Sequence, residues 1–138
     1  MRDIGSRLRS ERGAVVVEFA LLIPLLLMIV VGTIEFGRVY SQFQVFNAAA
    51  REGARCAAVQ ATPFRDCVVQ DRIDSGATPY EPAEDAKVSV GGLDGLACDD
   101  TTIGDPVTVS WSQPFDLDIP FWGDVTITRT IESTFRCE

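Results

Sequence analysis

The sequence contains no histidine among its 138 residues. Histidine is the side chain that enzymes use most often for general acid–base catalysis at neutral pH. The sequence also contains no G-x-S-x-G turn, no Walker loop and no dinucleotide-binding fingerprint. Acidic pairs such as Asp99-Asp100 and Glu84-Asp85 fit solvated turns better than a catalytic site. We therefore predict that the protein is not an enzyme and that it holds no cofactor.

Basic residues are scarce after the first thirteen positions. The net charge is −8, to which residues 1–13 contribute +2 and the remainder −10. Phosphate recognition requires a basic surface, so the acidic remainder argues against nucleic acid as a partner. The simplest role for this acidity is to keep the domain soluble.

Cysteine is absent from the first 55 residues. The four cysteines that follow form an even set, which indicates disulfides in an oxidising compartment: Cys56, Cys67, Cys98 and Cys137. Without histidine or a C-x-x-C pair, they do not match a zinc site or a redox motif, and residues 94–105 lack the alternation of a calcium loop. We favour the pairs Cys56–Cys67 and Cys98–Cys137, with the crossed pairings as alternatives.

One long apolar run stands out, AVVVEFALLIPLLLMIVVGTI, from Ala14 to Ile34. As a helix it would be roughly 31 Å long, enough to cross the hydrocarbon core of a bilayer. Arginines precede it, so the positive-inside rule places the N-terminus in the cytoplasm and the C-terminal part outside. A cleaved secretory signal has a shorter apolar core and a nearby small-residue site, whereas the nearest such cluster here is residues 48–50.

Two residues inside this run do not suit a plain anchor. Glu18 carries its only charge, and an acid in a membrane span is either tolerated near the interface or has a cationic partner. That partner is Arg9 or Arg12, or a free amino group created by cleavage before Ala14. Pro24 removes one helix hydrogen bond, which produces a kink or a weak point in a helix that moves between bilayer and polymer.

The helix is expected to continue to Val59, because no proline occurs between residues 25 and 62 and an apolar stripe recurs every three or four residues. The stripe comprises Phe36, Val39, Tyr40, Phe43, Phe46, Ala50, Ala54 and Ala57. It packs either on the protein's own small domain or on a partner, and different faces of the helix allow both.

Residues 60–86 are rich in turn-forming residues, with a short helix expected around Cys67–Ile73. Alternation predicts strands at Lys87–Val90, Val107–Trp111 and Val125–Phe135. Residues 91–95 and 113–123 are expected to connect them, and the last strands to form a hairpin or meander. The predicted fold is α+β: a long transmembrane helix that extends into a small antiparallel sheet stapled by disulfides.

Four aromatic residues of the C-terminal part invite two interpretations. They either pack in the core, which is the more frequent case, or form an exposed patch for a ligand. They are Trp111, Phe115, Phe121 and Trp122.

The segments RGAVVVEFALLIPLLLMIVVGTIEFGRVY (Arg12–Tyr40) and NAAAREGAR (Asn47–Arg55) resemble the TadE-like minor pseudopilins of the tight-adherence (Tad/Flp) pilus system. The resemblance implies that a prepilin peptidase cuts between Gly13 and Ala14. It also implies that Glu18 and Phe19 serve peptidase recognition and pilus assembly, with the Glu18 carboxylate neutralising the new amino group of an adjacent subunit.

The resemblance further implies a minor pseudopilin in the inner membrane that takes part in pilus assembly and surface adherence. Its partners would be other pilin subunits, the Tad assembly machinery and the peptidase. The expected parts are a basic leader (1–13), a membrane span (14–34), a helical extension (35–59) and a head (60–138). Major Flp pilins are very short, so a head this large suits a minor component. The alternative is a membrane-anchored adhesin or binding module that is never polymerised.

Overall fold

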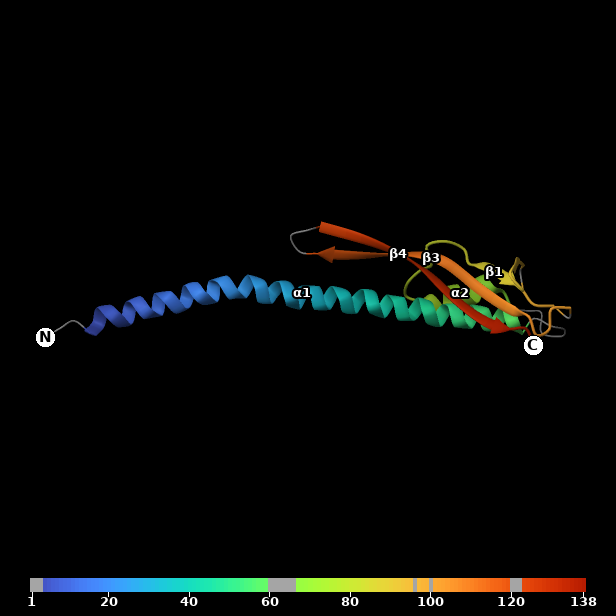
Figure 1. Ribbon diagram of the computed structural model, residues 1–138, viewed down its shortest axis with the longest axis horizontal. Helices are drawn as coiled ribbons and strands as arrows, with labels where there is room; N and C mark the ends of the chain where they lie inside the picture. The colour runs from blue at the N-terminus through green and yellow to red at the C-terminus, as the bar shows by residue number, and fades with distance from the viewer. Residues whose placement is uncertain (1–3, 60–66, 96, 100, 120–122) are drawn as a thin grey trace.

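A computed structural model describes residues 4–59, 67–95, 97–99, 101–119 and 123–138. A long helix carries a small head at its C-terminal end (Figure 1). The elements in chain order are α1 (Ile4–Ala58), α2 (Val69–Ala77), β1 (Lys87–Val90), β2 (Leu93–Asp94), β3 (Pro106–Ile119) and β4 (Gly123–Arg136). The predicted α+β fold, a long apolar helix followed by an antiparallel sheet with disulfides, is confirmed.

Helix α1 begins at Ile4, so the expectation that it begins at Ala14 is wrong. Residues 4–13 contain no proline and several strong helix formers, and the helix of the apolar run therefore continues backwards through them. At its other end α1 stops at Ala58, and the Val59 amide still donates to the Arg55 carbonyl at 3.2 Å. Pro24 lies inside the helix, which runs continuously through it.

The two halves of α1 have opposite environments. In the first half the large apolar side chains are exposed, as for Leu21 and Ile34 at 74% and 63%. In the second half Phe46, Ala50 and Ala54 are buried against the head. The predicted stripe therefore packs on the protein's own domain over this part of its length.

The sheet has the strand order β2-β1-β3-β4, and every neighbouring pair is antiparallel. β3 and β4 form a long hairpin in register from Pro106↔Arg136 to Ile119↔Gly123. The expectation that residues 113–123 form a connection is therefore wrong, because residues 113–119 continue β3. Their low strand propensity is overridden by pairing with β4, which alternates over its whole length.

The other head elements lie close to their expected places. β1 occupies Lys87–Val90 as predicted, and the connection after it contains the two-residue strand β2. The helix expected around Cys67–Ile73 is α2, which starts and ends later, at Val69 and Ala77.

The core forms where α1 meets the sheet. Phe46 contacts Trp111 and Phe115 edge-on, with ring centroids 6.4 and 6.0 Å apart. Both partner rings are almost fully buried, so the core interpretation of these two aromatics is confirmed. Phe121 and Trp122 lie outside the described residues.

Small residues let α2 approach α1 closely. A Cβ added to Gly53 would lie 2.5 Å from Cγ1 of Ile73, and one added to Gly76 would lie 3.2 Å from the Cα of Ala49. Ala49, Ala50, Gly53 and Ala54 belong to the NAAAREGAR stretch. That stretch is therefore the contact surface between the helix and the head.

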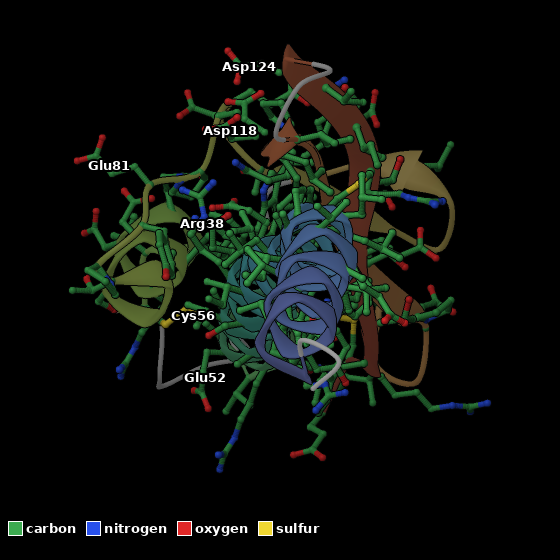
Figure 2. The ribbon with its side chains drawn as sticks, turned by 90° about the vertical axis from the view of Figure 1, so that its left-hand side faces the viewer. Arg38, Glu52, Cys56, Glu81, Asp118 and Asp124 are labelled. Carbon is green, nitrogen blue, oxygen red and sulfur yellow. A yellow bond between two sulfur atoms is a disulfide. The ribbon has the colours of Figure 1, made fainter. Side chains whose placement is uncertain are left out.

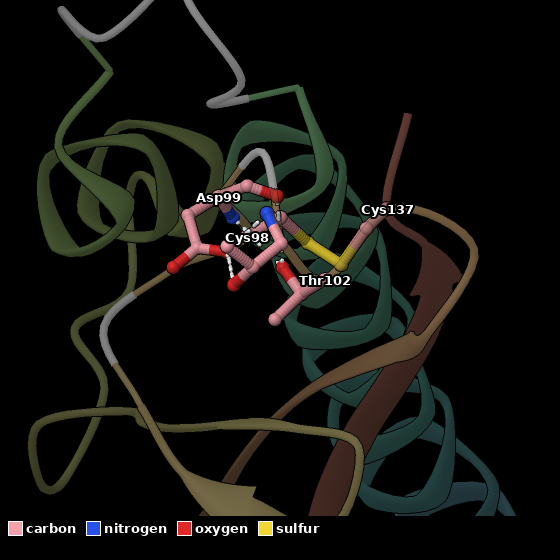
Figure 3. Close-up of a disulfide and its surroundings, with 5 residues drawn as sticks. Cys98, Asp99, Thr102 and Cys137 are labelled. Atoms are coloured by element: carbon pink, nitrogen blue, oxygen red, sulfur yellow. Dashed lines mark hydrogen bonds between the residues drawn. A yellow bond between two sulfur atoms is a disulfide. The ribbon is translucent and has the colours of Figure 1, made fainter.

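Both favoured disulfides are present, Cys56–Cys67 and Cys98–Cys137, with Cα–Cα distances of 5.9 and 5.6 Å. The first links the end of α1 to the segment before α2. The second links the chain end to the loop before β3, as the close-up shows (Figure 3). The first bridge therefore fastens the head to the last turn of α1, and the second joins two segments within the head.

Candidate assembly helix

The candidate functional surface is the exposed first half of α1. A helix that is apolar on all sides requires a membrane or partner helices around it. Within the part of the chain that the structure describes, α1 is the one helix long and apolar enough to cross a membrane, and its most apolar stretch is not buried against any other part of the chain. This segment therefore has the length and composition of a membrane anchor.

Glu18 interrupts this apolar surface. Its side chain is exposed, and it makes no hydrogen bond or salt bridge with any other described residue. The neighbours one helical turn away are Val15, Leu21 and Leu22, all exposed and apolar. Among the side chains that the structure describes, the carboxylate is thus an isolated charge on a surface that otherwise suits lipid, where a cationic partner would stabilise it. The side chains of Arg9 and Arg12, two of the partners considered from the sequence, lie outside those described.

Phe19 follows Glu18 and points its ring outward, with 62% of the residue exposed. The structure thus presents both members of the expected recognition pair on the open surface of α1. It does not join either of them to the head, so any role for this pair concerns molecules outside the chain.

The expected processing site, Gly13-Ala14, lies within α1, and both residues are exposed. No atom lies within 4 Å of a Cβ added at Gly13. Glycine weakens a helix interior by about 1 kcal/mol relative to alanine, so this turn opens more easily than its neighbours. The expected site is therefore accessible on the surface of α1.

A second feature lies where the exposed and packed halves of α1 meet. Arg38 forms a salt bridge with Glu35 at 2.6 Å, and its guanidinium also donates to the Asp116 carbonyl on β3 at 3.5 Å. Figure 2 shows Arg38 between the helix and the head. The sequence analysis did not predict a role for Glu35 and Arg38. Their i, i+3 spacing is nevertheless the spacing at which a salt bridge forms on a helix.

The predicted stripe on α1 divides at the same point. Val39 and Phe43 pack against the core, whereas Phe36 and Tyr40 remain 66% and 54% exposed. The two exposed rings stack on each other, with centroids 6.3 Å apart. Packing of the stripe on the protein's own domain is thus confirmed for Val39 and Phe43, whereas packing of its exposed part on a partner stays a prediction.

The acidic residues and cysteines that the structure describes in the head are not arranged for metal binding. Over the described ranges, no group of three or more histidine, cysteine, aspartate or glutamate side chains is placed to hold an ion. Asp99 instead organises a turn, because its carboxylate accepts hydrogen bonds from the Thr101 hydroxyl and amide at 2.6 and 2.9 Å. The hydrogen bond from the Thr101 hydroxyl, followed by that from the amide, lowers the pKa of Asp99.

A comparison with known protein families gives a match within the same helix. Residues 13–55 match the family model described as TadE-like protein. This helix is TadE-like. The match begins at the expected processing site, ends in the last turn of α1 and includes no residue of the sheet. It confirms the resemblance predicted from the sequence and indicates a protein related to the Tad pilus.

No curated protein and no solved structure matches the chain. The TadE-like segment contains both the exposed span and the small-residue surface on which the head packs. The similarity to a known family therefore covers the helix, while the head is described by its structure alone.

Proposed function

We propose that the protein is a minor pseudopilin that takes part in assembly of a Tad/Flp-type pilus and docks through its N-terminal helix. The observation that supports this most is the coincidence of the TadE-like match with a helix whose apolar surface is exposed and carries one unpartnered acid. A helix of this kind suits a chain that is stored in a membrane and then packs among other helices.

In this proposal the chain has four parts. Residues 1–13 are a cytoplasmic leader, 14–34 span the inner membrane, and 35–59 continue the helix outside the cytoplasm. Residues 60–138 form the head. The arginines before the span and the disulfides after it support this orientation, because disulfides persist in oxidising compartments.

The proposed chemistry uses two charges. Hydrolysis by a prepilin peptidase between Gly13 and Ala14 leaves a carboxylate on Gly13 and an ammonium group on Ala14. Glu18 lies four residues further, about 6 Å along the helix axis. When subunits pack with a stagger of about one turn, the Glu18 carboxylate of one chain meets the ammonium group of the next. Each charge is costly alone in an apolar environment and is neutralised in the pair.

The structure of the head supports a minor role. The head is fastened to the end of α1 by the Cys56–Cys67 disulfide and a shared core, so it travels with the helix as a unit. Each incorporated copy therefore adds a bulky domain to the assembly, which suits a component used in few copies. Adhesion to a surface would then involve the head, and assembly the first half of α1.

N-terminal sequencing of the protein purified from its native membrane tests this function. We expect the chain to begin at Ala14. An intact Met1, or a start near residue 51, would contradict handling by a prepilin peptidase. An intact Met1 on a surface-displayed protein would favour the alternative, a membrane-anchored binding module that is never polymerised.

A further inference from the structure

The β3–β4 hairpin turns back along α1 toward the membrane span, and its far end lies beside the middle of the helix (Figure 1). Two contacts fix its position along the axis. Phe115 meets Phe43 and Phe46, with ring centroids 6.0 Å apart in both cases. One residue further, the Asp116 carbonyl accepts the bond from Arg38.

These contacts set the depth of the hairpin end. From Asp116, β3 continues to Ile119, an advance of about 10 Å at the usual rise of a strand. The same distance along α1 corresponds to about seven residues. Counted back from Arg38 this reaches residue 31, and the equivalent count from Phe43 reaches about residue 34. The last residues of the hairpin therefore lie level with the end of the apolar span.

The two faces of the hairpin end differ in chemistry. On the face that continues the core, Leu117 lies opposite Val125, and Ile127 pairs with Phe115. Val125 and Ile127 are 42% and 41% exposed, and Leu117 and Ile119 are half-buried. The core thus ends before the hairpin does, and an apolar surface extends beyond it.

The opposite face is acidic. Asp118 lies directly across from Asp124 in the register, and both point away from α1 (Figure 2). Neither has a salt bridge with any residue that the structure describes. The adjacent Asp116 carboxylate accepts a bond from the Thr126 hydroxyl at 2.6 Å. At the level of the lipid headgroups, the two carboxylates would be attracted by the ammonium groups of zwitterionic lipids and repelled by anionic lipids.

We propose that the end of the β3–β4 hairpin enters the headgroup layer of the outer surface of the bilayer that α1 crosses. Its apolar face, formed at this depth by Leu117, Ile119 and Val125, contacts lipid. This surface is continuous with the exposed flank of α1, where Phe36 and Tyr40 lie at the same level. The hairpin gives the head a second contact with the membrane and fixes its tilt. The inference requires only that α1 spans the bilayer, and it does not rest on a role in a pilus.

Photocrosslinking tests this contact in the full-length protein, reconstituted in vesicles of phosphatidylethanolamine and phosphatidylcholine. A benzophenone-bearing phenylalanine is placed at position 125 and, in a second protein, at position 119. Position 93 serves as the control in the head, because Leu93 is 77% exposed and lies on β2, toward the other end of the sheet. Position 23, inside the apolar run, is the control for membrane insertion.

We expect lipid adducts at positions 23, 119 and 125 and at least tenfold fewer at position 93. Replacing a third of the lipid with anionic phosphatidylglycerol should reduce the adducts at 119 and 125 and leave those at 23 unchanged. Adducts at 23 but none at 119 and 125 would overturn the inference while leaving the membrane span intact. Adducts between two protein chains at 125 would also overturn it, because they would show a second copy on this surface. Absence of lipid adducts at 23 would contradict the span itself.

Discussion

The backbone amide of Cys98 donates a hydrogen bond of 3.0 Å to the carbonyl oxygen of Ala57 in the last turn of α1. The amide of Glu138 does the same for the carbonyl of Ala58, at 3.2 Å. The last carbonyl groups of a helix have no hydrogen-bond donor within the helix. Here the donors are the amides of Cys98, which belongs to the Cys98–Cys137 bridge, and of Glu138, which follows it. The disulfide therefore holds the cap of the helix together with the head.

We predict that the two disulfides contribute unequally to the free energy of unfolding. The bridged residues are 39 positions apart in Cys98–Cys137 and 11 apart in Cys56–Cys67. Loop-closure entropy predicts losses of about 4 and about 3 kcal/mol when each pair is replaced by serine. Urea unfolding of the detergent-solubilised protein, followed by circular dichroism, measures both. Equal losses, or a larger loss for the Cys56/Cys67 pair, would contradict the role given to the Cys98–Cys137 bridge.

We predict opposite effects on stability for substitutions of two glycines of α1, one in the contact with α2 and one outside it. In Gly53→Ala the new Cβ meets Ile73, whose side chain is fully buried, so we expect a loss of about 1–3 kcal/mol from overpacking. In Gly37→Ala no atom lies within 4 Å of the new Cβ, and the gain in helix propensity should be up to about 1 kcal/mol. Thermal unfolding of the two variants under the same conditions tests the sign of each change.

Gln113 is the buried polar side chain of the described core, and it joins two parts of the head. Its Oε1 atom accepts hydrogen bonds from the Ala83 amide at 3.0 Å and from Nε1 of Trp111 at 3.2 Å. Gln113→Met keeps most of the volume but leaves both donors without a partner, which should cost about 1–3 kcal/mol. Gln44→Met, at an exposed position of α1, should change the free energy of unfolding by less than about 0.5 kcal/mol.

We predict that Asp99 makes a small, pH-dependent contribution to the stability of the fold. Because hydrogen bonds from Thr101 lower its pKa in the folded state, the contribution is complete above its unfolded pKa of about 4. It is lost as the pH falls through the folded value. Asp99→Ala should therefore reduce the melting temperature at pH 7 and have little effect near pH 2. Asp94→Ala is the matched control, since that exposed carboxylate makes no hydrogen bond with the described residues. A deficit of the Asp99 variant that is equal at both pH values would refute the assignment.

The sequence predicts the local features of this protein better than its long-range ones. The apolar run and β1 follow from composition and periodicity, and the even number of cysteines indicates disulfides without deciding between their pairings. The extension of β3 through residues 113–119 does not follow from composition and periodicity, because proline and aspartate disfavour strands locally and only pairing with β4 compensates. The period of 3.6 also runs unchanged through Tyr40 and Phe43. It therefore does not indicate where the head begins to cover α1, which depends on the length of the hairpin.

The candidate site likewise has one feature that the sequence predicts and one that it does not. Glu18 is conspicuous in the sequence because a charge interrupts an apolar run, and the structure adds that no described residue of the chain neutralises it. The contact of Arg38 with Asp116 joins residues 78 positions apart. A single sequence gives no signal for such a pair, since neither residue is unusual in its local context.

Substitution of Glu18 is the most direct test of the proposed charge pair. Glu18→Ala removes a charge from the span, so insertion in the membrane should be unchanged or improved. Assembly should fail, because the ammonium group of the neighbouring subunit loses its partner. Breaking a buried ion pair costs about 3–5 kcal/mol, so incorporation into pili should fall by at least about a hundredfold. Immunoblotting of sheared pili and of the membrane fraction measures the two effects separately.

Glu52→Ala is the matched control for this experiment. Glu52 is also an exposed acid of α1, but it lies in the part of the helix that packs on the head, 34 residues after Glu18. Its removal should leave both membrane insertion and pilus incorporation unchanged. If both variants assemble like the unmodified protein, the charge pair plays no part in docking. If both fail equally, loss of negative charge from α1 in general, rather than the position of Glu18, explains the defect. Only a defect specific to Glu18→Ala, with normal amounts in the membrane, supports a contact between this carboxylate and an adjacent subunit.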